Sequence, residues 1–246
     1  MQLVNERIRT AFDKQASSLD LSGCELRLIP HEIKNLPSLI ELDLSRNNFI
    51  NLNLEPLGSL PGLQTLHLKS MNLVRIPSSI QACPQLKKLN LANNRIDKLE
   101  DIIGTFTRLE HLSLRNNEVE WVSEHLAKLQ RLKYLDLGGI KGNKLNNLPK
   151  AVFSLKQLIV LDVSSNNIGV LPEGIGDLTQ LQRLILRNNP IKQVPITITN
   201  LQKLQILDLS FNAELTTLPE NIKEMRNLHT LYLDARKLDN PLKKIQ

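Results

Sequence analysis

Five histidines and two cysteines are the side chains of this sequence that could bind a metal or attack a substrate. They are His31, His67, His111, His125 and His229, with Cys24 and Cys83. Protein metal sites place such ligands at short, characteristic spacings, and these residues show none. A nucleophilic thiol needs a polar, activating setting, whereas Cys83 replaces a leucine at a core position of a repeat. The sequence therefore predicts no metal, no cofactor, no catalytic residue and a buried, inert thiol at Cys83.

Residues 138–142, Gly-Gly-Ile-Lys-Gly, are the one glycine-rich segment that invites comparison with a phosphate-binding loop. The segment lacks the Gly-Lys-Ser/Thr ending and the spacing of such a loop. We interpret it as an insertion that lengthens one repeat, with Ile140, Lys141 and Gly142 as the extra residues. It is expected to bulge from the edge of the concave face. Ile140 then lies next to Tyr134 as an apolar rim contact, or the loop is a tolerated surface insertion with no role.

A leucine pattern, Leu-x-x-Leu-x-Leu-x-x-Asn-x-Leu, returns about every 23 residues and is the dominant feature of the chain. The apolar and polar alternation within Leu-x-Leu predicts a short strand with one buried face. No single copy can bury its leucines, so the copies must stack in parallel around one continuous core. The second leucine of the pattern marks about ten coils: Leu19, Leu42, Leu66, Leu89, Leu112, Leu135, Leu161, Leu184, Leu207 and Leu231.

The asparagine of the pattern is expected to be buried, where its amide can satisfy backbone groups that lose their sheet partners. This asparagine column comprises Asn47, Asn94, Asn117, Asn143, Asn166, Asn189 and Asn212. Cys24, Met71 and Arg236 replace it in three coils. A thioether is a poor hydrogen-bonding group, so we expect the Met71 coil to be less regular. Arg236 suggests that the last coil opens to solvent.

After the asparagine, many copies continue as apolar-Pro-x-x-apolar, as in Ile29-Pro30 with Ile33. Proline fixes φ and suits the first turn of a short helical segment. The outer side of the coils is therefore predicted to consist of short turns or 3₁₀ pieces. Trp121 falls on this arc, where we expect it to fill an irregular coil.

On these motifs the chain resembles the leucine-rich repeat superfamily, in the short intracellular type with repeats of about 23 residues. It is similar to Ras-pathway scaffold-like proteins and to bacterial effectors of that superfamily. The resemblance implies an α/β solenoid, a horseshoe with a parallel concave β-sheet and convex 3₁₀ turns. We expect residues 1–16 to form an N-terminal capping helix with Val4, Ile8, Ala11 and Phe12 inward, residues 17–238 the array, and residues 239–246 a short polar tail.

The sequence shows no apolar stretch typical of a secretory signal or of a membrane span. Cys24 and Cys83 lie more than two coils apart, which makes a disulfide between them implausible. A reducing, cytoplasmic location is the natural interpretation. The alternative is secretion into a host cell by a bacterium without a classical signal peptide.

The formal net charge is +6, and the excess of basic residues falls in the C-terminal half. The cluster between Lys128 and Lys156 is either a solvated basic face or a surface that meets an acidic partner. Nucleic acid is disfavoured, because only 3% of the residues are aromatic and basic and aromatic residues do not interleave. The basic residues of this cluster are Lys128, Arg131, Lys133, Lys141, Lys144, Lys150 and Lys156.

The side chains that flank the buried strand leucines should point to the concave face, where they form columns about 5 Å apart. The N-terminal coils place acids there, at Asp20, Glu41 and Asp43. The middle coils place a basic group there, and the C-terminal coils place apolar, aromatic and arginine residues with the composition of an interface hot spot. The predicted partner-binding residues are His67, Lys69, Lys88, His111 and Arg115 in the middle and Tyr134, Val160, Arg183, Ile185, Arg187, Ile206, Phe211 and Tyr232 in the C-terminal group.

The sequence therefore favours a monomeric, non-catalytic module that binds a partner protein through its concave face. The resemblance implies either an adaptor or scaffold, or a bacterial effector delivered into a host cell. The alternative is the substrate-recognition part of a larger enzyme, such as a ubiquitin ligase, whose catalytic domain is absent here.

Overall fold

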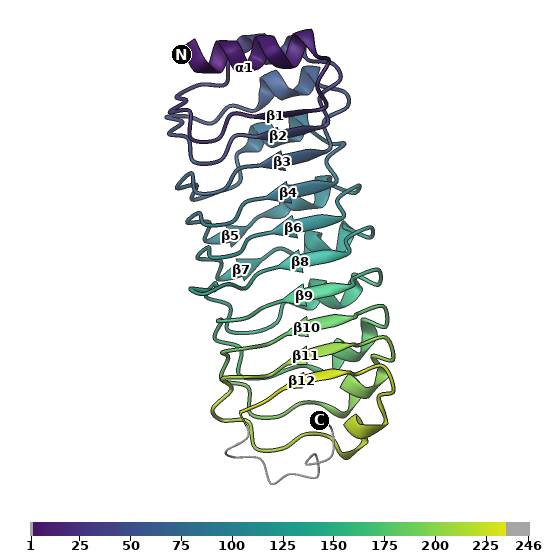
Figure 1. Cartoon of the computed structure of the whole chain (residues 1–246). Coiled ribbons are helices and arrows are strands. Elements are labelled where there is room, and N and C mark those ends of the chain that lie inside the picture. The colour runs from purple at the N-terminus through teal and green to yellow at the C-terminus, as the bar shows by residue number, and fades with distance from the viewer. Residues whose placement is uncertain (1, 235–246) are drawn as a thin grey trace.

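The chain folds into an elongated stack of coils, with a helix across its N-terminal end (Figure 1). This computed structural model describes residues 2–234. A parallel sheet runs along one side of the stack, and short 3₁₀ helices run along the opposite side. The buried residues form one continuous hydrophobic core between these two layers. The predicted leucine-rich repeat horseshoe is thereby confirmed.

Within residues 2–234, ten short strands form the sheet, and strands of successive coils pair with one another. The register aligns Leu19 with Leu42 and continues in steps to Leu207 with Leu231, so the leucines that mark the coils are correctly predicted. The strands are β1 (Ser18–Asp20), β2 (Glu41–Asp43), β3 (Thr65–His67), β4 (Lys88–Asn90), β6 (His111–Ser113), β8 (Tyr134–Asp136), β9 (Val160–Asp162), β10 (Arg183–Ile185), β11 (Ile206–Asp208) and β12 (Thr230–Tyr232).

The outer side carries 3₁₀ helices of five residues, as the sequence predicts. The proline position differs slightly from the prediction. Pro30 precedes the helix rather than entering its first turn, with φ −59° and ψ 132°, and its carbonyl accepts the N–H of Ile33 at 3.2 Å. The 3₁₀ helices are η1 (His31–Asn35), η2 (Glu55–Ser59), η3 (Ser78–Ala82), η4 (Asp101–Thr105), η5 (Glu124–Lys128), η6 (Lys150–Ser154), η7 (Glu173–Asp177), η8 (Ile196–Asn200) and η9 (Glu220–Glu224).

A second, two-stranded sheet pairs β5 (Lys98–Leu99) with β7 (Trp121–Val122). The expectation that Trp121 fills an irregular coil is wrong, because its side chain is 49% exposed. Alternation along β7 turns Val122 into the core and leaves Trp121 outside.

The asparagine column forms a ladder of amides that are buried except for the half-buried Asn166, and Asn94 shows the pattern. Its Oδ1 accepts the N–H groups of Met71 at 2.9 Å and Leu73 at 3.1 Å. Its Nδ2 donates to the carbonyl oxygens of Leu68 and Leu91, both at 2.8 Å. Each amide thus joins its own coil to the preceding one, which confirms the predicted role.

The coils that lack this asparagine are less regular, as predicted for Met71. In the third coil both Ser70 and Asn72, on either side of Met71, have positive φ, at 55° and 56°. The Cys24 coil likewise has two residues with positive φ, Gly23 and Glu25. Arg236, the third replacement, and the expected tail at 239–246 lie outside the described residues.

The insertion in the sixth coil begins one residue earlier than predicted. Gly142, directly before Asn143, has φ +63°, which matches the φ of 53° at Asn116 directly before Asn117. Gly142 therefore occupies a regular position of the coil. The extra residues are Gly139, Ile140 and Lys141, and Ile140 is 89% exposed, which confirms the predicted bulge.

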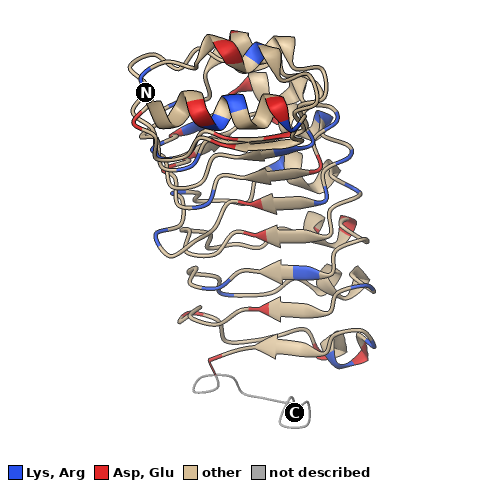
Figure 2. Cartoon of the chain, turned by 45° about the horizontal axis from the view of Figure 1, so that its top comes forward, with Lys and Arg blue, Asp and Glu red and all other residues tan. Residues whose placement is uncertain are grey.

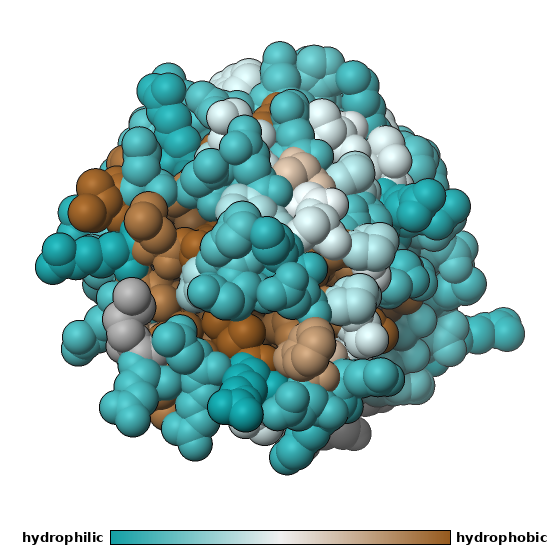
Figure 3. Space-filling model, turned by 90° about the horizontal axis from the view of Figure 1, so that it is seen from above, coloured by the Kyte–Doolittle hydropathy of each residue, from teal (hydrophilic) through white to brown (hydrophobic). Residues whose placement is uncertain are grey.

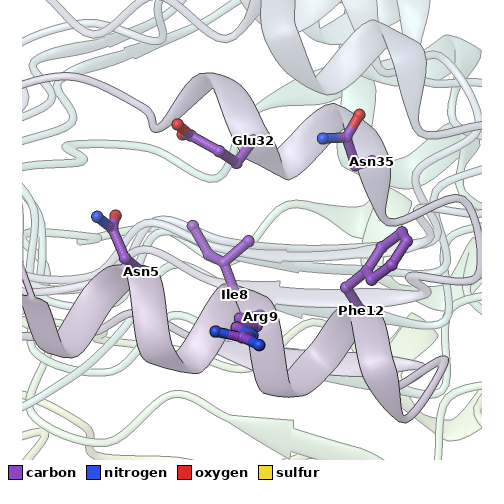
Figure 4. Close-up of a pocket in the computed structure, with 6 residues that line it drawn as sticks. All are labelled: Asn5, Ile8, Arg9, Phe12, Glu32 and Asn35. Atoms are coloured by element: carbon purple, nitrogen blue, oxygen red, sulfur yellow. The ribbon is translucent and has the colours of Figure 1, made fainter.

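Helix α1 (Gln2–Asp13) covers the end of the core with Val4, Ile8 and Ala11. The inward position predicted for Phe12 is wrong, because this ring is 56% exposed. Phe12 lines a groove of about 340 Å³ between α1 and η1, and Figure 4 shows Ile8 and Phe12 both pointing from the helix toward η1. Figure 3, seen from above α1, shows apolar atoms between polar side chains at this end.

Cys83 is buried, and burial raises the pKa of its thiol to about 11, so the thiol stays protonated at neutral pH. Both cysteines are free. Among the described residues, no helix is long and apolar enough to cross a membrane.

Candidate protein-binding surface

The eight residues predicted on the C-terminal coils lie on the strands or just after them, and we call them the C-terminal concave zone. Sheet register places Tyr134 beside Val160, Val160 beside Arg183, and Arg183 beside Ile206. These side chains form a row across four coils. The zone comprises Tyr134, Val160, Arg183, Ile185, Arg187, Ile206, Phe211 and Tyr232.

Three aromatic rings of the zone are solvent-accessible. Tyr134 is 39% exposed, and Phe211 and Tyr232 are each 54% exposed. Val160, Ile185 and Ile206 are half-buried between their strand neighbours. The short strands explain this arrangement, because each buries its central leucine and leaves both flanking residues on the concave face.

Arg187 and Phe211 form a pair at the carboxyl end of β10 and β11. The guanidinium carbon of Arg187 lies 4.0 Å from the centroid of the Phe211 ring. Its Nη1 also donates to Oγ of Ser210 at 2.9 Å. These contacts hold the arginine against the ring, so an apolar surface and a positive charge are presented together.

The middle residues form a less basic surface than the sequence suggests. Arg115 lies 3.1 Å from Asp162 and 3.7 Å from Asp136, so two carboxylates of later coils offset its charge. His67 lies 3.2 Å from Glu41. Within residues 2–234, Lys69 and Lys88 are the two predicted basic residues of this group that have neither an ion pair nor an aromatic partner.

The lysines between Lys128 and Lys156 are also partly neutralised. Lys133 contacts Glu110 at 2.8 Å, Lys144 contacts Glu118 at 2.9 Å, and Lys156 contacts Asp177 at 3.3 Å. Each acid belongs to a neighbouring coil, about 21 to 26 residues away in the chain. Figure 2 shows acidic and basic positions mixed along the stack rather than separated.

Asp136 and Asp162 on the concave face are held by neighbouring polar groups. Burial and the neighbouring Asp162 raise the pKa of Asp136, while the N–H of Gly138 and the charge of Arg115 oppose that shift. Both carboxylates are engaged by Arg115, and Asp136 also accepts a hydrogen bond from Oγ of Ser113 at 3.3 Å. Across residues 2–234, no three His, Cys, Asp or Glu side chains are grouped to hold a metal ion.

Two features of this surface escaped sequence reasoning. His111 stacks on Tyr134, which joins the middle group to the C-terminal concave zone. The predicted contact of Ile140 with Tyr134 is wrong. Ile140 instead lines a groove with Ser165, Asn188 and Phe211 at the carboxyl ends of the strands. The repeat pattern places His111 and Tyr134 in the same column of neighbouring coils, but it does not indicate that their rings stack. The direction taken by the inserted loop leaves no signal in the repeat pattern.

Sequence comparison agrees with the geometry of the stacked coils. Models of leucine-rich repeats match residues 16–36, 38–60, 61–104, 84–139 and 179–224, and a leucine-rich repeat region matches residues 118–189. This chain belongs to the leucine-rich repeat superfamily. No curated protein matches this leucine-rich repeat chain.

Solved structures of other leucine-rich repeat proteins superpose on most of this chain. A Leptospira interrogans protein shares 32% identity over 91% of the chain, with a TM-score of 0.81. The ectodomain of an Arabidopsis membrane receptor kinase, in complex with CASPARIAN STRIP INTEGRITY FACTOR 2, shares 31% identity over 83% of the chain, with a TM-score of 0.70. The chain spans 56% of the Leptospira chain and 26% of the plant chain.

A third structure, the leucine-rich repeat domain of the type III effector XopL, has a TM-score of 0.77. It covers 95% of this chain and 81% of its own, at 22% identity, and it supports the fold.

Proposed function

We propose that this chain is a non-catalytic module that binds a partner protein through the C-terminal concave zone. Leucine-rich repeat arrays generally mediate protein–protein interaction, because stacking creates an extended concave surface. The observation that carries the proposal is the row of Tyr134, Val160, Arg183 and Ile206 in sheet register, with two further exposed aromatic rings beside it. Aromatic and arginine side chains dominate the binding energy of protein interfaces.

The partner surface that fits this zone is apolar at its centre and acidic at its margin. Arg183 is exposed within the row, and Arg187 is held against Phe211. Steering by these charges predicts that association slows as ionic strength rises. Because Lys144 of the Lys128–Lys156 cluster is paired with Glu118, we expect Arg183→Gln to reduce this salt dependence more than Lys144→Gln does. Stopped-flow association rates measure both.

The biological setting that we propose is an adaptor or scaffold in the cytoplasm, or a bacterial effector delivered into a host cell. The likeness to the Leptospira protein favours a bacterial setting. The plant ectodomain bound to a polypeptide illustrates that such arrays take polypeptide ligands. If the chain is instead the recognition part of a larger enzyme, the intact mass of the native protein will exceed 27.9 kDa.

Affinity capture tests the proposal. Ile196, on the outer helix η8, provides a matched control, because it is 54% exposed, as is Tyr232. The wild type and Ile196→Ala should capture the same partner, and the double variant Tyr134→Ala, Tyr232→Ala should lose it. Equal capture by all three chains would contradict the proposal.

A further inference from the structure

A groove of about 330 Å³ lies at the margin of the concave face, at the carboxyl ends of the strands of coils six to nine. Ile140 of the insertion stands at one end, and Phe211 stands at the other. Residues of the intervening coils line the floor between them, among them Asn166, Asn167, Asn188 and Asn189, of which Asn167 and Asn188 are exposed.

The insertion is fastened at both sides, so Ile140 has a defined position although it is 89% exposed. The N–H of Gly139 donates to Oγ of Ser164 at 3.1 Å, and the N–H of Lys141 donates to Oδ1 of Asn116 at 3.1 Å. A Cβ at Gly139 would lie 2.1 Å from that same Oδ1. Glycine is therefore required for the close approach that orients the loop.

The other end of the groove is equally fixed. Phe211 has φ +60°, and its N–H donates to a carboxylate oxygen of Asp234 at 2.5 Å. Arg187 covers one face of its ring. Two apolar side chains, Ile140 and Phe211, thus stand at the ends of a polar floor. The insertion of residues 139–141 in the sixth coil creates this arrangement.

The floor has the chemistry of a peptide-binding surface. Nδ2 of Asn188 donates to Oγ of Ser165 at 3.1 Å, and Nδ2 of Asn167 donates to Oδ1 of Asn146 at 2.8 Å. These bonds orient the two amides. Within residues 2–234 no hydrogen bond uses the Oδ1 atom of either, so both oxygens remain available to accept from backbone N–H groups.

Length and charge define the occupant further. Three coil spacings of about 4.8 Å give roughly 15 Å, the length of four to five extended residues. At the Phe211 end Glu214 is paired with Lys192 at 3.1 Å, whereas Lys141 at the Ile140 end has no ion pair among the described residues. The groove therefore favours a negative charge near Lys141.

We propose that this groove binds an extended segment of a partner protein, with apolar side chains packed against Ile140 and Phe211 at its two ends and an acidic side chain near Lys141. The inference rests on the proposed partner-binding function and adds a second contact site, which borders the C-terminal concave zone at Phe211.

A random peptide library displayed on phage provides the probe. Selection against the wild type, with counter-selection against a chain lacking residues 139–141, should enrich sequences that combine an apolar and an acidic residue. The affinity of an enriched synthetic peptide should fall roughly tenfold or more in Ile140→Asp. It should be unchanged in Ile196→Asp, a control on the outer side, and in Tyr232→Ala.

Circular dichroism of each variant checks that the fold is retained. No enrichment, or an affinity unaffected by Ile140→Asp, would overturn the groove proposal and leave the concave proposal standing. A wild-type dimer in light scattering that dissociates in Ile140→Asp would assign the groove to a second copy of the chain and would also overturn it. If the double variant Tyr134→Ala, Tyr232→Ala loses partner capture but still binds the peptide, the groove and the C-terminal concave zone bind independently.

Discussion

The imidazole of His111 stacks on the phenol ring of Tyr134, with ring centroids 4.2 Å apart and planes inclined by 9°. The two residues are register partners on β6 and β8. An aromatic pair of this kind contributes about 0.5–1.5 kcal/mol beyond its buried area. The stack therefore holds Tyr134 in place at the N-terminal end of the C-terminal concave zone before any partner arrives.

Protonation of His111 is expected to destabilise the fold. Burial, followed by the charge of Lys88, lowers the pKa of His111 below its usual value of 6.5, and Lys133 acts in the same direction. The imidazole of His111 therefore binds a proton more readily in the unfolded chain than in the folded chain. The stabilising contribution is present above about pH 6.5 and is lost as the pH falls through the lowered pKa of the folded state.

The melting temperature of the wild type should accordingly fall more steeply between about pH 7.5 and pH 5 than that of His111→Phe. Phenylalanine keeps a ring against Tyr134 but cannot titrate. Thermal unfolding followed by circular dichroism provides both curves, and parallel curves would contradict the prediction.

Removing a buried amide of the asparagine column should be costly. Asn94→Ala leaves the N–H of Met71 and of Leu73 without their acceptor and two carbonyl oxygens without their donor. Each unsatisfied buried group costs about 1–3 kcal/mol, so the free energy of unfolding should fall by at least about 2 kcal/mol. Urea denaturation measures this, and the exposed Asn167→Ala serves as the control, with a change below about 0.5 kcal/mol. Similar losses in both variants would refute the account.

Shortening the sixth coil should be tolerated. Deleting residues 139–141 restores the common period while keeping Gly142, and the melting temperature should stay the same or rise. Gly142→Ala should instead lower it, because φ is +63° and the added Cβ would lie 1.5 Å from the carbonyl oxygen of Ser165. Differential scanning calorimetry compares the two. A large loss in the deletion variant would mean that the loop supports the core.

The repeat pattern was sufficient to predict the coils, the strand register and the buried amides, because these follow from one local rule applied to every copy. Leu42 and Asn94, for example, each occupy the position that their place in the pattern requires. Interactions between coils were harder to predict. Asp162 neutralises Arg115 from 47 residues away, and neither residue belongs to the leucine pattern.

Departures from the repeat were predicted least well. Asn143 is correctly placed in the asparagine column, but the pattern gives no information on the left-handed position before it, which Gly142 fills, so the predicted insertion is shifted by one residue. Phe12 has the spacing of an inward helical residue, yet the end of the core is already covered by Val4, Ile8 and Ala11. In both cases neighbouring coils decide the outcome, through contacts that have no counterpart elsewhere in the array.

Binding energy at the C-terminal concave zone is the central claim, and titration calorimetry with the captured partner measures it most directly. Tyr232→Ala should weaken binding by about 1–3 kcal/mol, which corresponds to roughly 5-fold to 150-fold in the dissociation constant. Ile196→Ala, which removes an equally exposed apolar side chain from the outer side, should leave the constant unchanged. An unchanged affinity in Tyr232→Ala and in Tyr134→Ala, or an equal loss in Ile196→Ala, would contradict the account.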